Sequence, residues 1–205
     1  MCFFTQQTSD AVALEKRFNA KVESPNELLI LNEVKGFTFP KTPVIIDKNP
    51  EIITQYKWGL IPHWSSNINV QKFTLNARIE TLSEKPSFRD STHKRCLILV
   101  NGFYEWKWLD AKGVKKEKYK ITVSGNTPFA LAGIYSNWVN KQTGELIHSY
   151  SILTTAANPL MAKIHNSKKR MPVVLLKEDE KKWLGNSDYN YFKFPYTNML
   201  EAELI

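Results

Sequence analysis

The feature that most constrains the fold of this 205-residue chain is the strand-forming run RCLILVNGFYEWKWL at residues 95–109. Aliphatic and aromatic residues dominate it, which is typical of strands with at least one buried face. Asn101 and Gly102 interrupt the run, and this pair predicts a bend or turn. We therefore expect strands to dominate the fold.

The other segments support the same expectation. Further strand patterns cover residues 43–47, 52–61, 117–123, 129–138, 148–155 and 172–176. Helical patterns cover residues 9–19 and 177–184, and residues 80–93 predict a helix or an irregular turn that Pro86 interrupts. The sequence thus predicts a mixed α/β (α+β) fold, a single domain over 1–205 with an antiparallel, barrel-like sheet core and short peripheral helices.

Composition narrows the class of protein and its partners. The formal net charge is +8, which favours anionic partners, nucleic acid first among them. A solvated surface explains such charge as well. The sequence has no apolar run long enough to span a membrane, no secretory signal pattern and no glycine-rich nucleotide-binding motif. We expect a monomeric cytoplasmic protein that needs no membrane and no cofactor.

The chain has two cysteines, Cys2 and Cys96, and no cysteine–histidine spacing typical of a zinc site, so we expect no metal. Cys2 follows the initiator methionine, whose removal exposes an α-amine beside a thiol. That pair suits an aldehyde: the amine condenses to an imine and the thiol then closes a thiazolidine ring. The same residue is also suited to attack on a peptide carbonyl. An inert, buried cysteine is the simpler interpretation.

Residues 73–80, FTLNARIE, place three polar side chains at alternate positions. Asn76 can donate a hydrogen bond to an oxyanion or hold a sugar hydroxyl, and Arg78 offers a planar fork for phosphate. An exposed polar edge on which Arg78 pairs with Glu80 remains the alternative.

Two further segments carry groups that can move protons. Glu105 lies among aromatic residues that include Trp106, and an apolar setting raises a carboxyl pKa toward the range of a general acid. His165 is followed by Lys169 and Arg170, cations that can hold a phosphate backbone. Glu105 facing solvent and His165 in an ordinary surface loop are the alternatives.

An aromatic side chain able to stack on a nucleobase is the last candidate. Two tryptophans flank a Gly/Pro turn at residues 58–64, WGLIPHW. Trp58 suits core packing, whereas Trp64 precedes polar residues and is the better candidate for stacking.

Taken in order, these motifs resemble the SRAP family, the SOS response-associated peptidases. The matching stretches cover nearly the whole chain. They are Met1-Cys2, TPVI at 42–45, WGLIPHW at 58–64, NARIE at 76–80, PSFRDS at 86–91, RCLILVNGFYEWK at 95–107, FALAGIY at 129–135, SILTTAAN at 151–158, and the stretch from Ile164-His165 to RMPVVL at 170–175.

The resemblance implies abasic-site processing in single-stranded DNA. Cys2, freed of Met1, would react with the aldehyde of the ring-opened abasic site and form a thiazolidine DNA–protein crosslink. Asn76 would orient the Cys2 amine or the sugar, Glu105 would act as general acid and base, and His165 would assist proton transfer at the sugar. The residues implied in DNA binding are Arg78 and Arg170 on phosphates and Trp64 on a base, with Lys169 and Trp106 beside them.

One spacing departs from the family pattern. The family form has the histidine two residues before the arginine of Arg-Met-Pro, whereas His165 precedes Arg170 by five. We expect His165 to reach the site if this loop bulges outward. A thiol peptidase that cleaves peptides in trans and a non-catalytic single-stranded DNA-binding module remain alternative functions.

Overall fold

The computed structural model describes residues 2–125, 127–196 and 198–205. Its strands are β1 (Phe4–Gln7), β2 (Lys21–Val22), β3 (Leu31–Lys35), β4 (Lys41–Ile46), β5 (Asn49–Trp58), β6 (Asn76–Arg78), β7 (Arg95–Val100), β8 (Gly102–Trp108), β9 (Lys116–Val123), β10 (Phe129–Val139), β11 (Leu146–Ala156), β12 (Arg170–Pro172) and β13 (Leu200–Leu204). Its helices are α1 (Ala11–Phe18), α2 (Pro159–Ile164) and α3 (Glu180–Leu184). Short 3₁₀ turns are η1 (Pro25–Glu27), η2 (Gly36–Thr38), η3 (Ile68–Phe73), η4 (Ile79–Thr81), η5 (Arg89–Ser91), η6 (Lys177–Asp179) and η7 (Tyr189–Phe192).

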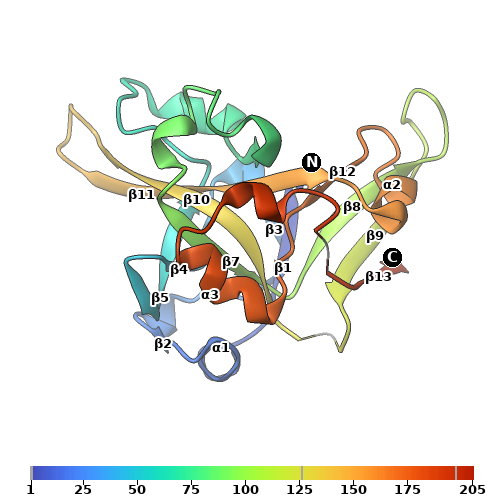
Figure 1. Ribbon diagram of the computed structural model, residues 1–205, viewed down its shortest axis with the longest axis horizontal. Coiled ribbons are helices and arrows are strands. Elements are labelled where there is room, and N and C mark those ends of the chain that lie inside the picture. The colour runs from blue at the N-terminus through green and yellow to red at the C-terminus, as the bar shows by residue number, and fades with distance from the viewer. Residues whose placement is uncertain (1, 126, 197) are drawn as a thin grey trace.

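The strands form a closed barrel and a second sheet beside it (Figure 1). Neighbours around the barrel are β11, β10, β7, β4 and β5, and a parallel pairing of β5 with β11 closes the ring. The second sheet has the order β13-β9-β8-β1-β3 and is antiparallel throughout. The predicted α+β class with a barrel-like sheet is confirmed.

The long run at residues 95–109 contributes one strand to each sheet. Strand β7 pairs on both edges inside the barrel, and β8 pairs with β1 and β9 in the second sheet. Asn101 stands between them, and its side-chain oxygen accepts hydrogen bonds from the amides of Thr8, at 2.8 Å, and Ser9, at 3.0 Å. The predicted bend is therefore the point at which the chain passes from one sheet to the other.

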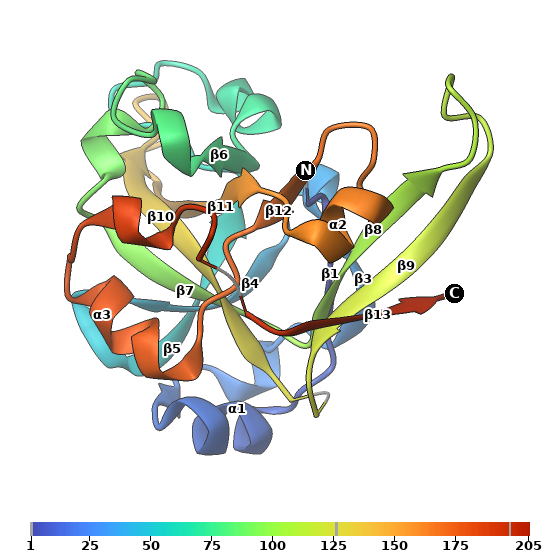
Figure 2. The same ribbon diagram turned by 45° about the vertical axis from the view of Figure 1, so that its right-hand side comes forward.

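Alternation along the barrel strands divides the core into two clusters. From β7, Cys96 and Ile98 join a cluster with Cys2 and Tyr150, whereas Leu97 joins the cluster that includes residues of α1 and α3. Because these two helices cover the outside of the barrel (Figure 2), the second cluster lies on its outer face. Burial on both faces explains why β7 reads as a continuous apolar run.

Several predicted boundaries shift for identifiable reasons. Strand β5 ends at Trp58 rather than residue 61, since Gly59 adopts φ +115°. The segment 80–93 is irregular, with 3₁₀ turns at its two ends. The predicted strand at 172–176 is β12 followed by a single bridge between Leu131 and Val174. Strands β1, β3 and β13 and helix α2 are absent from the sequence prediction, because such short elements have little periodicity of their own.

No helix among the described residues has the length and apolar character needed to cross a bilayer.

Candidate functional site

Cys2 lies at the entrance to β1 with none of its surface exposed. Strand β1 pairs with β8 through Phe4–Tyr104 and Thr5–Phe103, and this register carries Cys2 alongside the strand that holds Glu105. Burial, followed by the charge of Glu105, raises the pKa of the Cys2 thiol well above its usual range. The sulfur is therefore a neutral thiol in this setting. Met1, whose removal the sequence analysis expects, lies outside the described residues.

Asn76 fixes the backbone of Cys2. Strand β6 adds to the barrel by parallel pairing with β11, and Asn76 lies opposite Ile152 in that pairing. The Asn76 side-chain amide donates a 2.8 Å hydrogen bond to the Cys2 carbonyl oxygen. Its own Oδ1 is buried and accepts no hydrogen bond from the residues that the structure describes. That oxygen is thus available to a group that enters the site.

Glu105 and His165 meet in the same place from two different elements. Glu105 Oε2 and His165 Nε2 lie 3.9 Å apart, with 4% and 6% of the two residues exposed. Burial raises the pKa of Glu105 to about 7 and lowers that of His165 to about 4. At neutral pH Glu105 therefore titrates while His165 stays an uncharged imidazole. At that pH Glu105 can donate a proton and His165 can accept one.

The five-residue spacing between His165 and Arg170 is accommodated by a tight turn after α2. The carbonyl of His165 accepts hydrogen bonds from the amides of Lys168, at 3.4 Å, and Lys169, at 2.8 Å. Lys169 adopts φ +49°, so the chain reverses sharply before β12. The extra residues form this turn, and His165 Nε2 still lies 3.9 Å from Glu105 Oε2.

Asn166 attaches that loop to the strand of Glu105. Its side-chain oxygen accepts from the Trp108 amide at 3.0 Å, and its side-chain nitrogen donates to the Trp108 carbonyl at 2.8 Å. The side chain thereby imitates a strand partner at the end of β8. Sequence reasoning missed this role, because nothing in the pattern places residues 108 and 166 together.

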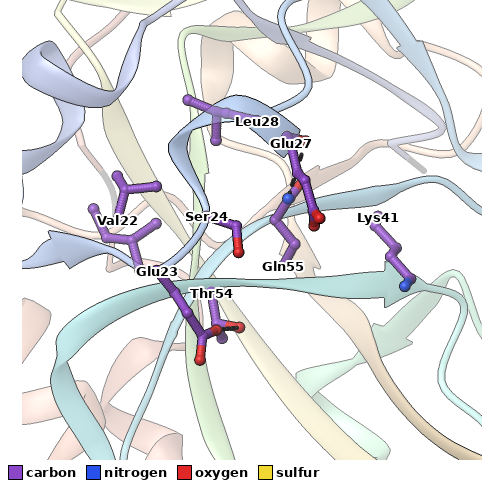
Figure 3. A pocket seen from close by; sticks show the side chains of 9 residues that line it. Val22, Glu23, Ser24, Glu27, Leu28, Lys41, Thr54 and Gln55 are labelled. Carbon is purple, nitrogen blue, oxygen red and sulfur yellow. Dashed lines mark hydrogen bonds between the residues drawn. The ribbon is translucent and has the colours of Figure 1, made fainter.

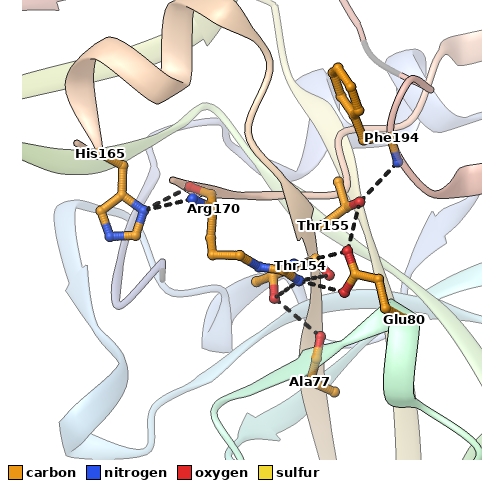
Figure 4. Close-up of polar contacts among 7 residues, drawn as sticks. All are labelled: Ala77, Glu80, Thr154, Thr155, His165, Arg170 and Phe194. Atoms are coloured by element: carbon orange, nitrogen blue, oxygen red, sulfur yellow. Dashed lines mark hydrogen bonds and ion pairs between the residues drawn. The ribbon is translucent and has the colours of Figure 1, made fainter. Parts of the chain in front are cut away.

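Arg170 is held by a carboxylate (Figure 4). Its Nη1 and Nη2 each lie 2.8 Å from an oxygen of Glu80, and Nη2 also donates to the Thr154 carbonyl at 2.7 Å. Only 12% of the Arg170 side chain is exposed. The guanidinium fork that the sequence analysis assigned to phosphate is therefore already engaged. Glu80, which one sequence alternative paired with Arg78, instead makes its ion pair with Arg170.

The remaining predicted DNA-binding residues differ in exposure. Arg78 is exposed on β6, two positions from Asn76 and on the same side of the strand. Trp64 is 49% exposed, and Lys169 is exposed in the loop before β12. Trp106 is half-buried, with its ring 4.8 Å from that of Phe4 and edge-on to it. The four predicted catalytic residues thus meet at one site, whereas these four occupy separate elements.

Two hollows elsewhere contain none of the predicted residues. One lies between β5 and the segment after β2, where Thr54 donates a 2.7 Å hydrogen bond to Glu23 and Gln55 donates to the Glu27 carbonyl (Figure 3). The other lies between α1 and α3 and contains Arg17 and Glu180. Among the described residues, no group of three or more histidine, cysteine, aspartate or glutamate side chains is arranged to hold a metal.

Solved structures of similar fold superpose on the whole length of this chain. A protein from Bacteroides thetaiotaomicron superposes with a TM-score of 0.90 and 34% identity, covering 100% of this chain and 92% of its own. A protein from Bordetella bronchiseptica superposes with a TM-score of 0.84 and 26% identity, covering 100% and 99%.

Two proteins that are similar to this chain in sequence have names that state a function. The abasic site processing protein YoqW of Bacillus subtilis is 42% identical over 153 residues, 73% of this chain and 66% of its own. The abasic site processing protein HMCES of Xenopus tropicalis is 30% identical over 158 residues, 67% of this chain and 46% of its own. The match therefore spans about half to two thirds of these relatives. A sequence model described as SOS response associated peptidase (SRAP) matches residues 1–200, and the chain belongs to this family.

Proposed function

We propose that this protein processes abasic sites in single-stranded DNA by covalent attachment through Cys2, after Met1 has been removed. The observation that carries the proposal is the meeting of Cys2 with Asn76, Glu105 and His165 in one buried site. The names of the relatives YoqW and HMCES support abasic sites as the substrate. The net charge of +8 supports a nucleic-acid partner.

The proposed reaction uses both nucleophiles of an N-terminal cysteine. The free α-amine adds to the aldehyde carbon of the ring-opened abasic sugar and gives a carbinolamine, which loses water to form an imine. The thiol sulfur then bonds to the imine carbon, and the thiol proton moves to the nitrogen. The product is a thiazolidine, and one water is released overall.

The environment of Cys2 supports this order of attack. A buried thiol with a raised pKa is a poor thiolate nucleophile but retains the proton that ring closure must deliver to nitrogen. The α-amine has a reference pKa of about 7.7–8.0, so a useful fraction is unprotonated near neutral pH. We infer that the amine reacts first and the sulfur second.

Glu105 and His165 have complementary tasks in this proposal. Glu105, with a pKa of about 7, donates a proton to the departing hydroxyl of the carbinolamine and can take one back. His165 is an uncharged imidazole at neutral pH, so it can accept a proton during opening of the sugar ring. Asn76 holds the Cys2 carbonyl, which fixes the direction of the amine. A lyase step at the sugar would use the same groups.

The experiment is intact-mass spectrometry of the purified full chain, alone and after incubation with a single-stranded oligonucleotide that carries one abasic site. We expect the protein alone to lack Met1, and the mixture to contain a species heavier by the oligonucleotide minus one water. An oligonucleotide without the lesion is the control. A chain that keeps Met1, or a mixture without a covalent species, contradicts the proposal.

The peptidase named in the family description is the second candidate, since a thiol peptidase would use the same cysteine. It predicts turnover of peptides in trans that DNA does not affect. A non-catalytic DNA-binding module predicts full affinity in Cys2→Ala and no covalent species in any variant. The raised thiol pKa favours amine-first chemistry over direct thiolate attack on a peptide.

Arg78→Ala tests the DNA-binding part of the proposal. Arg78 is exposed beside Asn76, so we expect weaker binding and a salt dependence whose logarithmic slope falls by about one for a lost phosphate contact. Fluorescence anisotropy with a labelled oligonucleotide at several salt concentrations measures the slope. Arg89→Ala, an exposed arginine on η5, is the comparison variant. An unchanged slope removes Arg78 from the DNA-binding surface.

A further inference from the structure

Glu80 and Arg170 connect two segments that carry functional side chains. Glu80 lies in η4, directly after β6 with Asn76, and Arg170 begins β12, directly after the His165 loop. The two side chains form a two-point ion pair, with both N–O distances 2.8 Å (Figure 4). Paired contacts of this kind fix the orientation of both groups as well as their separation.

The ion pair is anchored to the barrel. Arg170 Nη2 also donates to the carbonyl and to the hydroxyl of Thr154, at 2.7 and 3.2 Å. Glu80 Oε1 accepts from the Thr155 hydroxyl at 3.3 Å. Both threonines lie in β11, a barrel strand whose side chains are buried at these positions. Arg170 is therefore held against a buried strand of the barrel.

The backbone of Arg170 determines which ring nitrogen of His165 carries the proton, because both its carbonyl and its amide lie near Nδ1. His165 Nδ1 lies 2.7 Å from the Arg170 carbonyl oxygen and 3.3 Å from the Arg170 amide nitrogen. The carbonyl contact requires a proton on Nδ1, whereas the amide contact requires a lone pair there. The shorter distance favours the carbonyl contact, which leaves the lone pair on Nε2, the nitrogen 3.9 Å from Glu105.

This choice between carbonyl and amide depends on small movements of a turn. Lys169, directly before Arg170, adopts φ +49°, a conformation that costs a lysine about 1 kcal/mol or more. Such a turn relaxes unless its neighbours hold it. The two contacts, of 2.7 and 3.3 Å, differ in length by about 0.6 Å, so a displacement of that size at Arg170 would change which of its backbone groups lies nearer to Nδ1.

We propose that Glu80 is a positioning residue: by holding Arg170, it keeps the Arg170 carbonyl on His165 Nδ1 and so presents the Nε2 lone pair toward Glu105. Glu80 touches no reacting atom in this proposal. The positioning role does not itself require the proposed function, because the protonation pattern of His165 exists with or without DNA. Only the catalytic consequence of that role rests on the proposed function. The consequence is that Nε2 is ready to accept a proton in the sugar chemistry.

The test measures the His165 ring nitrogens directly. ¹⁵N NMR of histidine side chains separates a protonated from an unprotonated nitrogen, and His165→Gln assigns the signals among the four histidines. In the wild-type chain at pH 7 we expect a protonated Nδ1 and an unprotonated Nε2. In Glu80→Gln we expect a mixture of the two tautomers. Glu80→Asp retains the charge, and we expect it to restore part of the wild-type pattern.

A second ion pair of the same type supplies the matched control. Arg17 and Glu180 pair through contacts of 3.2 and 2.6 Å between α1 and α3, and Glu180→Gln should leave the His165 signals unchanged. Crosslinking by Glu80→Gln to an abasic oligonucleotide should slow by up to about 100-fold, since small displacements of reacting groups have effects of this size. Thermal unfolding establishes that the variants are folded.

Each outcome decides something. Unchanged His165 signals in a folded Glu80→Gln overturn the proposal. A slower reaction with unchanged signals also overturns it and places Arg170 in phosphate binding instead. Changed signals in a protein that forms no crosslink even as wild type uphold the positioning role and reject the proposed function.

Discussion

The two cysteines are equally buried and belong to the same core cluster, yet the groups around them differ. Cys2 and Cys96 have no exposed surface, and burial raises the pKa of both thiols. Each also has a carboxylate nearby whose charge raises it further, Glu105 for Cys2 and Asp47 for Cys96. By these measures alone the two residues cannot be told apart.

Their neighbours differ. Cys96 lies within β7 and has a strand partner on each side, Ile46 on β4 and Gly133 on β10. Cys2 lies outside regular strand pairing, and a side chain, Asn76, holds its carbonyl. The comparison teaches that burial alone does not distinguish Cys2 from Cys96. The difference lies in the side chain that holds the Cys2 backbone and in the proton-carrying groups beside it.

Replacing each cysteine in turn gives the largest expected difference. Cys2→Ala should abolish the stable covalent species with abasic DNA, because without the sulfur an imine formed by the α-amine cannot close to a ring and hydrolyses back to aldehyde and amine. Cys96→Ala should form it to the wild-type extent. Intact-mass spectrometry after equal incubation, followed by denaturation in water to hydrolyse any unclosed imine, measures the stable adduct of both variants. A stable adduct retained in Cys2→Ala, or lost in a folded Cys96→Ala, would contradict this prediction.

Glu105→Gln tests the proposed proton donor beside Cys2. Loss of a general acid should slow crosslinking by about 100-fold or more. The wild-type rate should rise as the α-amine loses its proton and fall above pH about 7 as Glu105 ionises, which gives a bell-shaped profile. The falling limb should be missing in the variant. A profile with the same falling limb in both proteins would assign the acid to another residue.

The same substitution has a stability effect whose sign is fixed. Since the pKa of Glu105 rises from 4.5 to about 7 on folding, the unfolded chain ionises first and the native state loses stability between these pH values. The full loss above pH 7 is about 3 kcal/mol. Glu105→Gln cannot ionise, so its stability relative to wild type should increase from pH 4 to pH 8. Urea unfolding at both pH values measures the change; no change would mean that Glu105 is solvated.

Gly133→Ala tests the Cys96 side. A Cβ at Gly133 would lie 2.5 Å from Ile98 Cδ1 and 2.8 Å from Cys96 Sγ, which is too close for any side chain. We expect a loss of about 1–3 kcal/mol in the free energy of unfolding, measured in urea. Crosslinking at a temperature where the variant is folded should stay unchanged. A slower reaction under those conditions would couple the two cysteine regions.

Asn166→Ala should have the smallest effect. It removes the two hydrogen bonds that tie the His165 loop to Trp108, and we expect less than about 1 kcal/mol in stability because the contacts are exposed. Crosslinking should slow less than tenfold. Asn140→Ala, which removes a turn contact to the Gln142 amide at the far end of β10, is the control. Equal rates in the two variants would show that the loop needs no such tie.

The sequence alone determined the class of fold and the set of candidate catalytic residues. Local patterns were sufficient for the strands at 95–109 and 129–138, because buried strands carry their own hydrophobic signal. The family motifs identified Cys2, Asn76, Glu105 and His165 as candidates.

Only the tertiary structure decided which of these groups meet and what holds them. The strand order places β1 beside β8. A turn at Lys169 accommodates the unusual spacing between His165 and Arg170, and His165 lies beside Glu105. The tertiary structure also pairs the guanidinium of Arg170 with Glu80, which lies 90 residues away in the chain. Pairings between distant segments depend on strand register and loop closure, and a local sequence pattern predicts neither of them.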